Sequence, residues 1–130
     1  MFEVSVSSSF SAAHHLEGYQ GKCEAQHGHN WKVEVYVRGE DLDDTGMLID
    51  FRNLKDSLRD VLSTFDHTDL NTLEPFKKNN PTSENIAIFL YKELSLKLNC
   101  DKYQIYRVTV HETPESGASY GLDTIRKGIS

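Results

Sequence analysis

Residues 27–38 read HGHNWKVEVYVR, and the alternation of apolar and polar side chains in this stretch decides the fold. Four apolar residues, from Trp31 to Val37, share one parity, while polar and charged residues take the other. Because successive side chains on a strand point to opposite faces, this pattern predicts a half-buried β-strand. If the strand extends back to residue 27, His27 and His29 lie on its apolar face.

Three other segments predict strands by the same reasoning. Residues 2–15 begin with alternation and predict a strand that is bulged around its serines. Residues 103–111 alternate again, with the apolar side chains from Tyr106 to Val110 on one face. A last strand is predicted over residues 119–126, after a turn that contains proline and glycine.

Two helices are predicted between the second and third strands. Asp50 precedes apolar residues at helical spacing, and its short carboxylate can accept from the free N–H groups of a first helical turn. Pro81-Thr82 opens the second helix, with Glu84 in its first turn. The order ββααββ predicts an α+β fold with an antiparallel sheet, in a single domain over residues 1–130.

Composition narrows the classes of function. The chain has 130 residues, with 20 acidic and 14 basic side chains, and a formal net charge of −6. This balance argues against general binding of nucleic acid, and no apolar run approaches the ~18 residues of a membrane span. No signal peptide is visible, and two cysteines, Cys23 and Cys100, form no disulfide framework. We therefore expect a cytoplasmic protein.

Six histidines stand out in so short a chain, and three of them share one pattern. His14 has the parity of the apolar residues on the first strand, as His27 and His29 have on the second. Antiparallel pairing would bring the end of the first strand beside the start of the second. Three neutral imidazoles with an open fourth position describe a catalytic zinc site, whereas three hydrogen-bonded structural histidines are the plainer alternative.

Other polar residues have two interpretations each. Cys23 is either a fourth zinc ligand that closes the site or a free thiolate beside the metal. Asp66 next to His67 suits proton transfer, because a carboxylate fixes the tautomer of a histidine. A histidine at the end of a helix, with an aspartate as its cap, would show the same sequence pattern. Glu112 has inward parity and would need a partner such as a heterocycle with an N–H and an amino group, unless it is exposed at the strand end.

Taken together, these pieces resemble the family of 6-pyruvoyl-tetrahydropterin synthases and 6-carboxytetrahydropterin synthases. The resemblance covers nearly the whole chain and rests on the segments FSAAH (10–14), CEAQHGHN (23–30), FDHTDLN (65–71), NPTSE (80–84) and HET (111–113). It implies a tunnelling fold, in which ββααββ subunits join their sheets into an oligomeric barrel. A homohexamer, built as a dimer of trimers with sites at subunit interfaces, is the expected assembly.

The resemblance also implies roles for individual residues. It assigns zinc to the three histidines, catalysis to Cys23 with Asp66 and His67, and pterin binding to Glu112. Thr82, Ser83 and Glu84 would lie near the same pocket. The short spacing from Cys23 to His27 is similar to that of the bacterial enzymes of queuosine biosynthesis. Those convert 7,8-dihydroneopterin triphosphate to 6-carboxy-5,6,7,8-tetrahydropterin and release acetaldehyde and triphosphate.

Three alternatives remain open at the level of sequence. Glu24 follows Cys23, and some family members use a glutamate in this tract to form 6-hydroxymethyl-dihydropterin, a folate precursor. A 6-pyruvoyl-tetrahydropterin product is the second alternative. The third is not enzymatic: a zinc-stabilised module that binds a pterin or purine without turnover.

Overall fold

The computed structural model describes residues 1–18 and 25–122, and these form one sheet with two helices. The strands are β1 (Phe2–His14), β2 (His27–Gly39), β3 (Thr68–Asp69), β4 (Gln104–Thr113) and β5 (Ser116–Gly121). The helices are α1 (Phe51–Leu62) and α2 (Ser83–Leu98), with short 3-10 turns at Leu70–Thr72 and Glu74–Phe76. The predicted α+β class is confirmed, and the predicted strands and helices occur in the expected order, with the short β3 added between the two helices.

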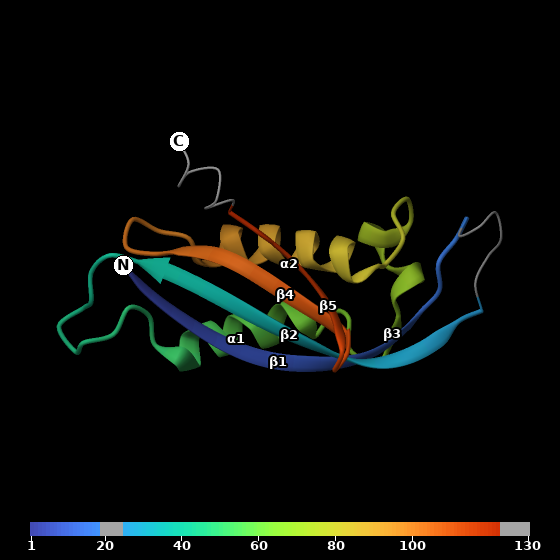
Figure 1. Ribbon diagram of the computed structural model, residues 1–130, viewed down its shortest axis with the longest axis horizontal. Helices are drawn as coiled ribbons and strands as arrows, with labels where there is room; N and C mark the ends of the chain where they lie inside the picture. The colour runs from blue at the N-terminus through green and yellow to red at the C-terminus, as the bar shows by residue number, and fades with distance from the viewer. Residues whose placement is uncertain (19–24, 123–130) are drawn as a thin grey trace.

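The strand order in the sheet is β3-β1-β2-β4-β5 (Figure 1). All neighbours pair antiparallel except the two-residue β3, which runs parallel to β1. The sheet is therefore mixed, and the prediction of a purely antiparallel sheet is wrong at this edge. β3 arises because the chain returns after α1 alongside the end of β1, where Ala12 and Ala13 are its partners.

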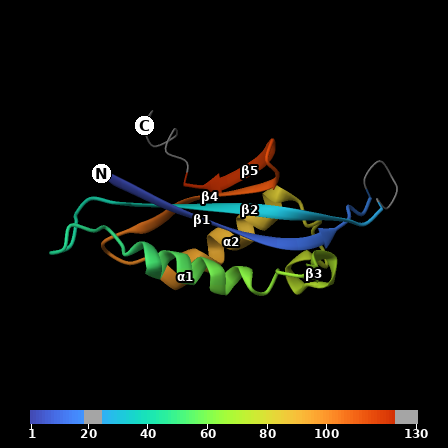
Figure 2. The same ribbon diagram turned by 90° about the horizontal axis from the view of Figure 1, so that it is seen from below.

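Both helices pack on the same face of the sheet, and no helix of the described residues lies on the other face (Figure 2). The core lies between these two layers and includes Trp31, Phe10, Leu54, Leu90 and Val108. The alternation of β2 thus divides its side chains between the core and the open face, as its sequence predicts. No helix among residues 1–18 and 25–122 is long and apolar enough to cross a membrane.

Both helices begin where the sequence predicts, α1 after the predicted cap Asp50 and α2 after Thr82. The carboxylate of Asp50 accepts a hydrogen bond of 2.8 Å from the backbone N–H of Arg52. The hydroxyl of Thr82 accepts one of 3.1 Å from the N–H of Asn85. Each cap satisfies an amide that lacks an intrahelical partner. The start of α2 lies beside the end of β1, where the carbonyl of Pro81 contacts Nδ1 of His14.

Three details of the strands differ from prediction. β1 pairs with β2 without a break from Phe2↔Gly39 to His14↔His27, so the expected serine bulge is absent. A bulge occurs instead in β4, where Tyr106 is the extra residue opposite β2 and contacts Arg38. Ile105 takes the core position there. β5 begins at Ser116 rather than residue 119, because the turn at 114–115 is short; the predicted residues 123–126 lie outside the described part.

Candidate metal centre

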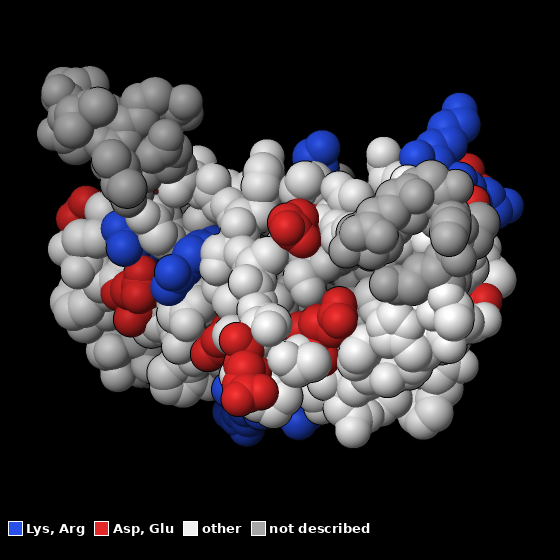
Figure 3. Space-filling model, turned by 45° about the vertical axis from the view of Figure 1, so that its right-hand side comes forward, with Lys and Arg blue, Asp and Glu red and all other residues white. Residues whose placement is uncertain are grey.

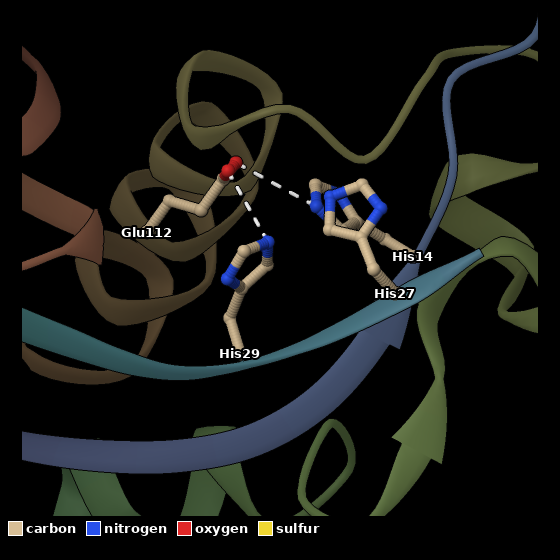
Figure 4. A group of neighbouring side chains, drawn as sticks. All are labelled: His14, His27, His29 and Glu112. Atoms are coloured by element: carbon tan, nitrogen blue, oxygen red, sulfur yellow. Dashed lines mark ion pairs between the residues drawn. The ribbon is translucent and has the colours of Figure 1, made fainter. Parts of the chain in front are cut away.

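The register of β1 and β2 places three histidines together at one end of the sheet. His14 on β1 is the direct partner of His27 on β2, and His29 lies two residues further along. Their ring centroids are separated by 4.7–5.2 Å, and the rings meet edge to face. The convergence expected from strand parity is therefore present, with side chains that point toward one another (Figure 4).

Backbone carbonyls orient two of the three imidazoles. Nδ1 of His14 lies 2.9 Å from the carbonyl oxygen of Pro81, and Nδ1 of His27 lies 3.0 Å from that of Ala25. A carbonyl oxygen only accepts, so Nδ1 is the protonated nitrogen in both rings. The lone pair of each neutral ring is then on Nε2, which is the usual arrangement of a histidine that binds a metal. Nothing in the sequence pattern pointed to Pro81 in this role.

His14 is the most buried member, with 2% of its surface exposed. Burial lowers the pKa of His14, an effect partly offset by the hydrogen bond to Pro81 and the charge of Glu112. A neutral imidazole keeps its lone pair available for a cation. Among the described residues, Nε2 of His14 and Nε2 of His29 are buried and have no hydrogen-bond partner. Two buried nitrogens that lie close together without a hydrogen-bond partner are typical of a metal site.

Glu112 completes the cluster from β4. Its Oε2 lies 3.3 Å from Nε2 of His29, and its Oε1 lies 3.6 Å from Nε2 of His14 (Figure 4). One ligand atom from each of the four residues falls within 4.8 Å of every other. The pairing of β4 with β5 shifts by one residue between His111 and Thr113, so Glu112 sits at an irregularity of the sheet.

The donor set fits a divalent transition metal. Imidazole nitrogens and a carboxylate oxygen are ligands of zinc, which prefers four donors in a tetrahedron. The side of the molecule that carries this end of the sheet has acidic side chains toward its middle, with basic ones mainly around its margin (Figure 3). This distribution favours a cation. The three histidines and Glu112 thus form a metal-binding cluster.

A cavity of about 240 Å³ opens beside the cluster. Its lining consists of His14, Leu16, His27, Thr82, Ser83, Glu84 and Glu112. The four residues predicted to bind substrate therefore share one cavity with two of the histidines. The N-terminus of α2 also borders this space, and its unpaired amides favour negative charge. Leu16 was not predicted, because a lone leucine in a loop carries no signal.

A larger cavity of about 590 Å³ lies at the other end of the sheet, lined by residues that include Arg38, Tyr103 and Leu122. None of the residues predicted to function lies there. Size alone would favour this cavity. Chemistry favours the smaller one, which holds unsatisfied nitrogens and a converging carboxylate.

Asp66 and His67 form a separate pair at the edge of β1. The carboxylate of Asp66 accepts 2.8 Å from the N–H of Ser11 and lies 3.1 Å from Nδ1 of His67. The N–H of Ser11 is the main cause of a lowered pKa for Asp66. His67 has a φ of 58°, and 82% of its side chain is exposed. Neither residue lines the cavity beside the histidines.

Two of the predicted catalytic residues, Cys23 and Glu24, lie outside the described residues. His15 and His111, which received no role from the sequence, pair with Glu17 at 3.5 Å and with Glu34 at 3.0 Å. Both stand apart from the metal-binding cluster.

Comparison with known proteins identifies the family. The model of the family "6-pyruvoyl tetrahydropterin synthase" matches residues 3–123. A protein of Archaeoglobus fulgidus, provisionally named a 6-carboxy-5,6,7,8-tetrahydropterin synthase, is 41% identical over 116 residues, covering 88% of this chain and 91% of its own. The 6-carboxy-5,6,7,8-tetrahydropterin synthase of Bacillus subtilis is 35% identical over 126 residues, covering 92% and 84%.

A solved structure agrees with the sequence matches. The 6-pyruvoyl tetrahydropterin synthase of Caenorhabditis elegans has a TM-score of 0.82 and 34% identity, covering 94% of this chain and 96% of its own. The metal-binding cluster also stands where the family motifs of the sequence place it. The chain belongs to the 6-pyruvoyl tetrahydropterin synthase family and is a pterin-forming lyase of that family.

Proposed function

We propose that the protein converts 7,8-dihydroneopterin triphosphate to 6-carboxy-5,6,7,8-tetrahydropterin, with release of acetaldehyde and triphosphate, and that it serves queuosine biosynthesis in the cytoplasm. The observation that carries the proposal is the convergence of three histidines and Glu112 on one cavity. The names of the Archaeoglobus and Bacillus relatives support the carboxypterin product. The short Cys23-to-His27 spacing supports the same choice.

Zinc is the metal that we propose for the cluster, held by His14, His27 and His29. When bound, zinc supplies Lewis-acid polarisation of the substrate's side-chain oxygens and lowers the pKa of groups close to it. The protein orients the imidazoles through the carbonyls of Pro81 and Ala25, so that their Nε2 lone pairs face the site.

Substrate positioning falls to the residues around the cavity. The carboxylate of Glu112 can accept from two adjacent donors, which suits the ring N–H and amino group of a pterin. Thr82 and Ser83 offer hydroxyls at the start of α2, and Glu84 lies at the rim. Fixing the ring in this way holds the three-carbon side chain at a constant distance from the proton-transfer groups.

The reaction requires protons to move along that side chain. The first side-chain carbon gains an oxygen from water and is oxidised to the carboxyl carbon, while the ring is reduced from the dihydro to the tetrahydro level. The other two carbons leave as acetaldehyde after triphosphate departs. We assign removal of a side-chain proton to the thiolate of Cys23. His67, oriented by Asp66 at 3.1 Å, would return protons to the ring or the leaving groups.

We further propose that copies of the chain assemble into the hexameric barrel that the family resemblance implies. Two sheet edges among the described residues support this assembly. β5 pairs only with β4. The outer edge of β1 pairs with β3 at Ala12 and Ala13, and its Ser11 bonds Asp66 and His67, so this edge has no strand partner from Phe2 to Phe10. Unpaired edges of this length accept a strand from another chain. The open face of the sheet would then line the barrel.

Product identification tests the function directly. Purified protein loaded with zinc is incubated with 7,8-dihydroneopterin triphosphate, and the products are separated and weighed by mass spectrometry. Acetaldehyde together with the carboxypterin is the expected result. A 6-pyruvoyl-tetrahydropterin would contradict the proposal, as would a 6-hydroxymethyl-dihydropterin formed with Glu24 as the base.

The role of Cys23 is tested by comparing Cys23→Ala with Glu24→Gln. We expect Cys23→Ala to retain zinc but to lose turnover by ~10²–10⁴-fold, the usual contribution of a proton-transfer group. Glu24→Gln should keep both. Zinc content is measured by elemental analysis and turnover by acetaldehyde release. Loss of zinc in Cys23→Ala would mean that the thiolate closes a structural site instead.

A further inference from the structure

The contacts of Glu112 are unusual for a carboxylate whose only task is to bind a pterin. Its two oxygens face Nε2 of His14 and Nε2 of His29, one each, at 3.6 and 3.3 Å. Charge-assisted hydrogen bonds to a carboxylate are shorter, at about 2.7–2.9 Å. Neither nitrogen has a hydrogen-bond partner among the described residues. The carboxylate is thus aimed at both rings without forming a hydrogen bond to either.

The tautomer of His14 makes its contact with Glu112 unfavourable in the absence of a cation. Nδ1 of His14 donates to the carbonyl of Pro81, so Nε2 of the neutral ring is an acceptor. The facing oxygen of Glu112 is also an acceptor. Two acceptors that face each other in a place as buried as His14 repel unless a cation lies between them.

The separations match two ligands of one metal ion. Zinc lies about 2.0–2.2 Å from imidazole nitrogen and carboxylate oxygen, so two such donors on a tetrahedron are about 3.3–3.5 Å apart. The observed distances of 3.3 and 3.6 Å agree with this spacing. These two separations fit Glu112 as a fourth protein ligand.

We propose that Glu112 is the fourth protein ligand of the metal in the substrate-free enzyme, and that pterin binding must withdraw it from the metal. The second half rests on the proposed function, in which Glu112 pairs with the pterin ring. Both of its oxygens face the histidines, and both are needed to accept from two adjacent pterin donors. The metal and the pterin ring therefore compete for one carboxylate.

Because of this competition, the fourth position of the metal is closed in the substrate-free enzyme and open when a pterin is bound. Four protein ligands hold zinc firmly and leave no position for other molecules, as in a structural site. Withdrawal of Glu112 by a pterin ring leaves the three histidines, which is the composition of a catalytic site. Substrate recognition at the ring would thereby be coupled to exposure of the metal.

Zinc affinity of the substrate-free protein tests the first half. Metal-free wild type, Glu112→Gln and Glu84→Gln compete with a chromogenic chelator for Zn²⁺, after circular dichroism has verified their fold. Glu84 is the matched control, because it lines the same cavity but stands outside the cluster. We expect Glu112→Gln to weaken zinc binding by on the order of 100-fold or more, beyond the loss typical of outer-shell partners.

The control decides the outcome of this experiment. A loss in Glu112→Gln no larger than that in Glu84→Gln overturns the proposal, because charge in the cavity would then explain it. Should Glu112→Gln fail to fold, Glu112→Asp replaces it, since it keeps the charge but draws the carboxylate back. Zinc affinity of Glu112→Asp at the wild-type level would overturn the proposal equally.

Binding of 6-methylpterin, which lacks the hydroxylated side chain, tests the second half. We expect its affinity, measured by fluorescence titration, to be about 10-fold lower for zinc-loaded than for metal-free wild type, and saturating pterin to lower zinc affinity by the same factor, as linkage requires. Equal affinity for both forms overturns the exchange. Binding to neither form overturns the exchange and the proposed pterin role of Glu112, while the chelator result stands independently.

Discussion

The histidine cluster and the Asp66–His67 pair both adjoin the end of β1, but they are built in opposite ways. The cluster lies on the side of the sheet that the helices cover, and His14 is 2% exposed. The pair lies at the outer edge of β1, with 42% of the Asp66 side chain and 82% of the His67 side chain exposed. Backbone contacts of Ser11 hold the pair in place, about 10 Å along the strand from His14.

The difference indicates how the active site is divided. Strand register within a single chain suffices to gather the metal ligands, because β1, β2 and β4 are neighbours in one sheet. The pair of Asp66 and His67, which we propose for proton transfer, has no such convergence, and it faces outward from the chain that carries it. We therefore expect the pair of one copy to serve the cluster of another.

The largest effect should come from His14→Ala compared with His15→Ala. These adjacent residues lie on opposite faces of the chain, and only His14 belongs to the cluster. We expect His14→Ala to lose its zinc and to fall in turnover by on the order of 10³-fold or more, because the Lewis acid is gone. His15→Ala should keep both. Elemental analysis and an acetaldehyde assay measure the two quantities; loss of zinc in both variants would contradict a site defined by strand parity.

Mixing two inactive variants tests whether the pair acts across copies. His29→Ala removes a metal ligand, and His67→Ala removes the proton-transfer group. If each site combines a cluster and a pair from different chains, oligomers assembled from equal amounts of both variants recover about a quarter of wild-type activity through random association. The variants are co-expressed with different tags and the mixed oligomers purified.

Each variant alone provides the control for this mixture. A cluster and a pair acting within one chain would leave every site with one defect, and the mixed oligomers would then be as inactive as either parent. Recovery would also require that a second copy contacts the edge of β1, which the free length of that strand allows.

Strand parity explains why so much of the cluster is predictable from the sequence. Alternation along β1 and β2 fixes which face His14, His27 and His29 share, and antiparallel pairing fixes where they meet. Strand parity also places Glu112 on the inner face of β4, with Val108 and Val110. That its carboxylate meets the histidines is not predictable in this way, because it depends on the register in which β4 pairs with β2. Irregular pairing likewise leaves no signal in the hydrophobic pattern.

Tyr106 illustrates the same limit within the fold. Its parity with Val108 and Val110 places it in the core, yet the bulge turns it toward Arg38, whose guanidinium carbon lies 3.5 Å from the centre of its ring. The sequence does not indicate the left-handed backbone of His67 either, because glycine or asparagine would be the expected residue in that conformation. Local pattern predicts regular strands, whereas these departures are set by the neighbouring strand and turn.

A stability measurement on His67→Gly probes the strain in the pair. With φ at 58°, a side chain at position 67 is held in a conformation that costs a residue with Cβ about 1–2 kcal/mol. Because the imidazole is mostly exposed, its removal sacrifices little packing. We expect His67→Gly to raise the free energy of unfolding by about 1 kcal/mol in urea titrations while abolishing turnover.

The matched variant is His67→Ala, which removes the imidazole but keeps Cβ. It should lose turnover equally and gain no stability. A His67→Gly protein less stable than wild type would mean that the imidazole contributes to the fold through its contact with Asp66, and that the strain is not retained for function.

The smallest effect concerns the charge of Asp66 and appears only on acidification. The N–H of Ser11 is the first cause that holds the pKa of Asp66 below its ordinary value, so the unfolded chain binds this proton more readily than the folded one. The resulting stabilisation is present above the ordinary pKa of about 3.9 and is lost as the pH falls through the lowered native pKa. Asp66→Asn keeps an oxygen for the N–H of Ser11 but lacks the charge. The Tm of metal-free wild type should exceed that of metal-free Asp66→Asn at about pH 6, and the gap should narrow toward about pH 3. A Tm difference that does not change with pH would mean that the charge of Asp66 contributes nothing to the stability that its contact with Ser11 provides.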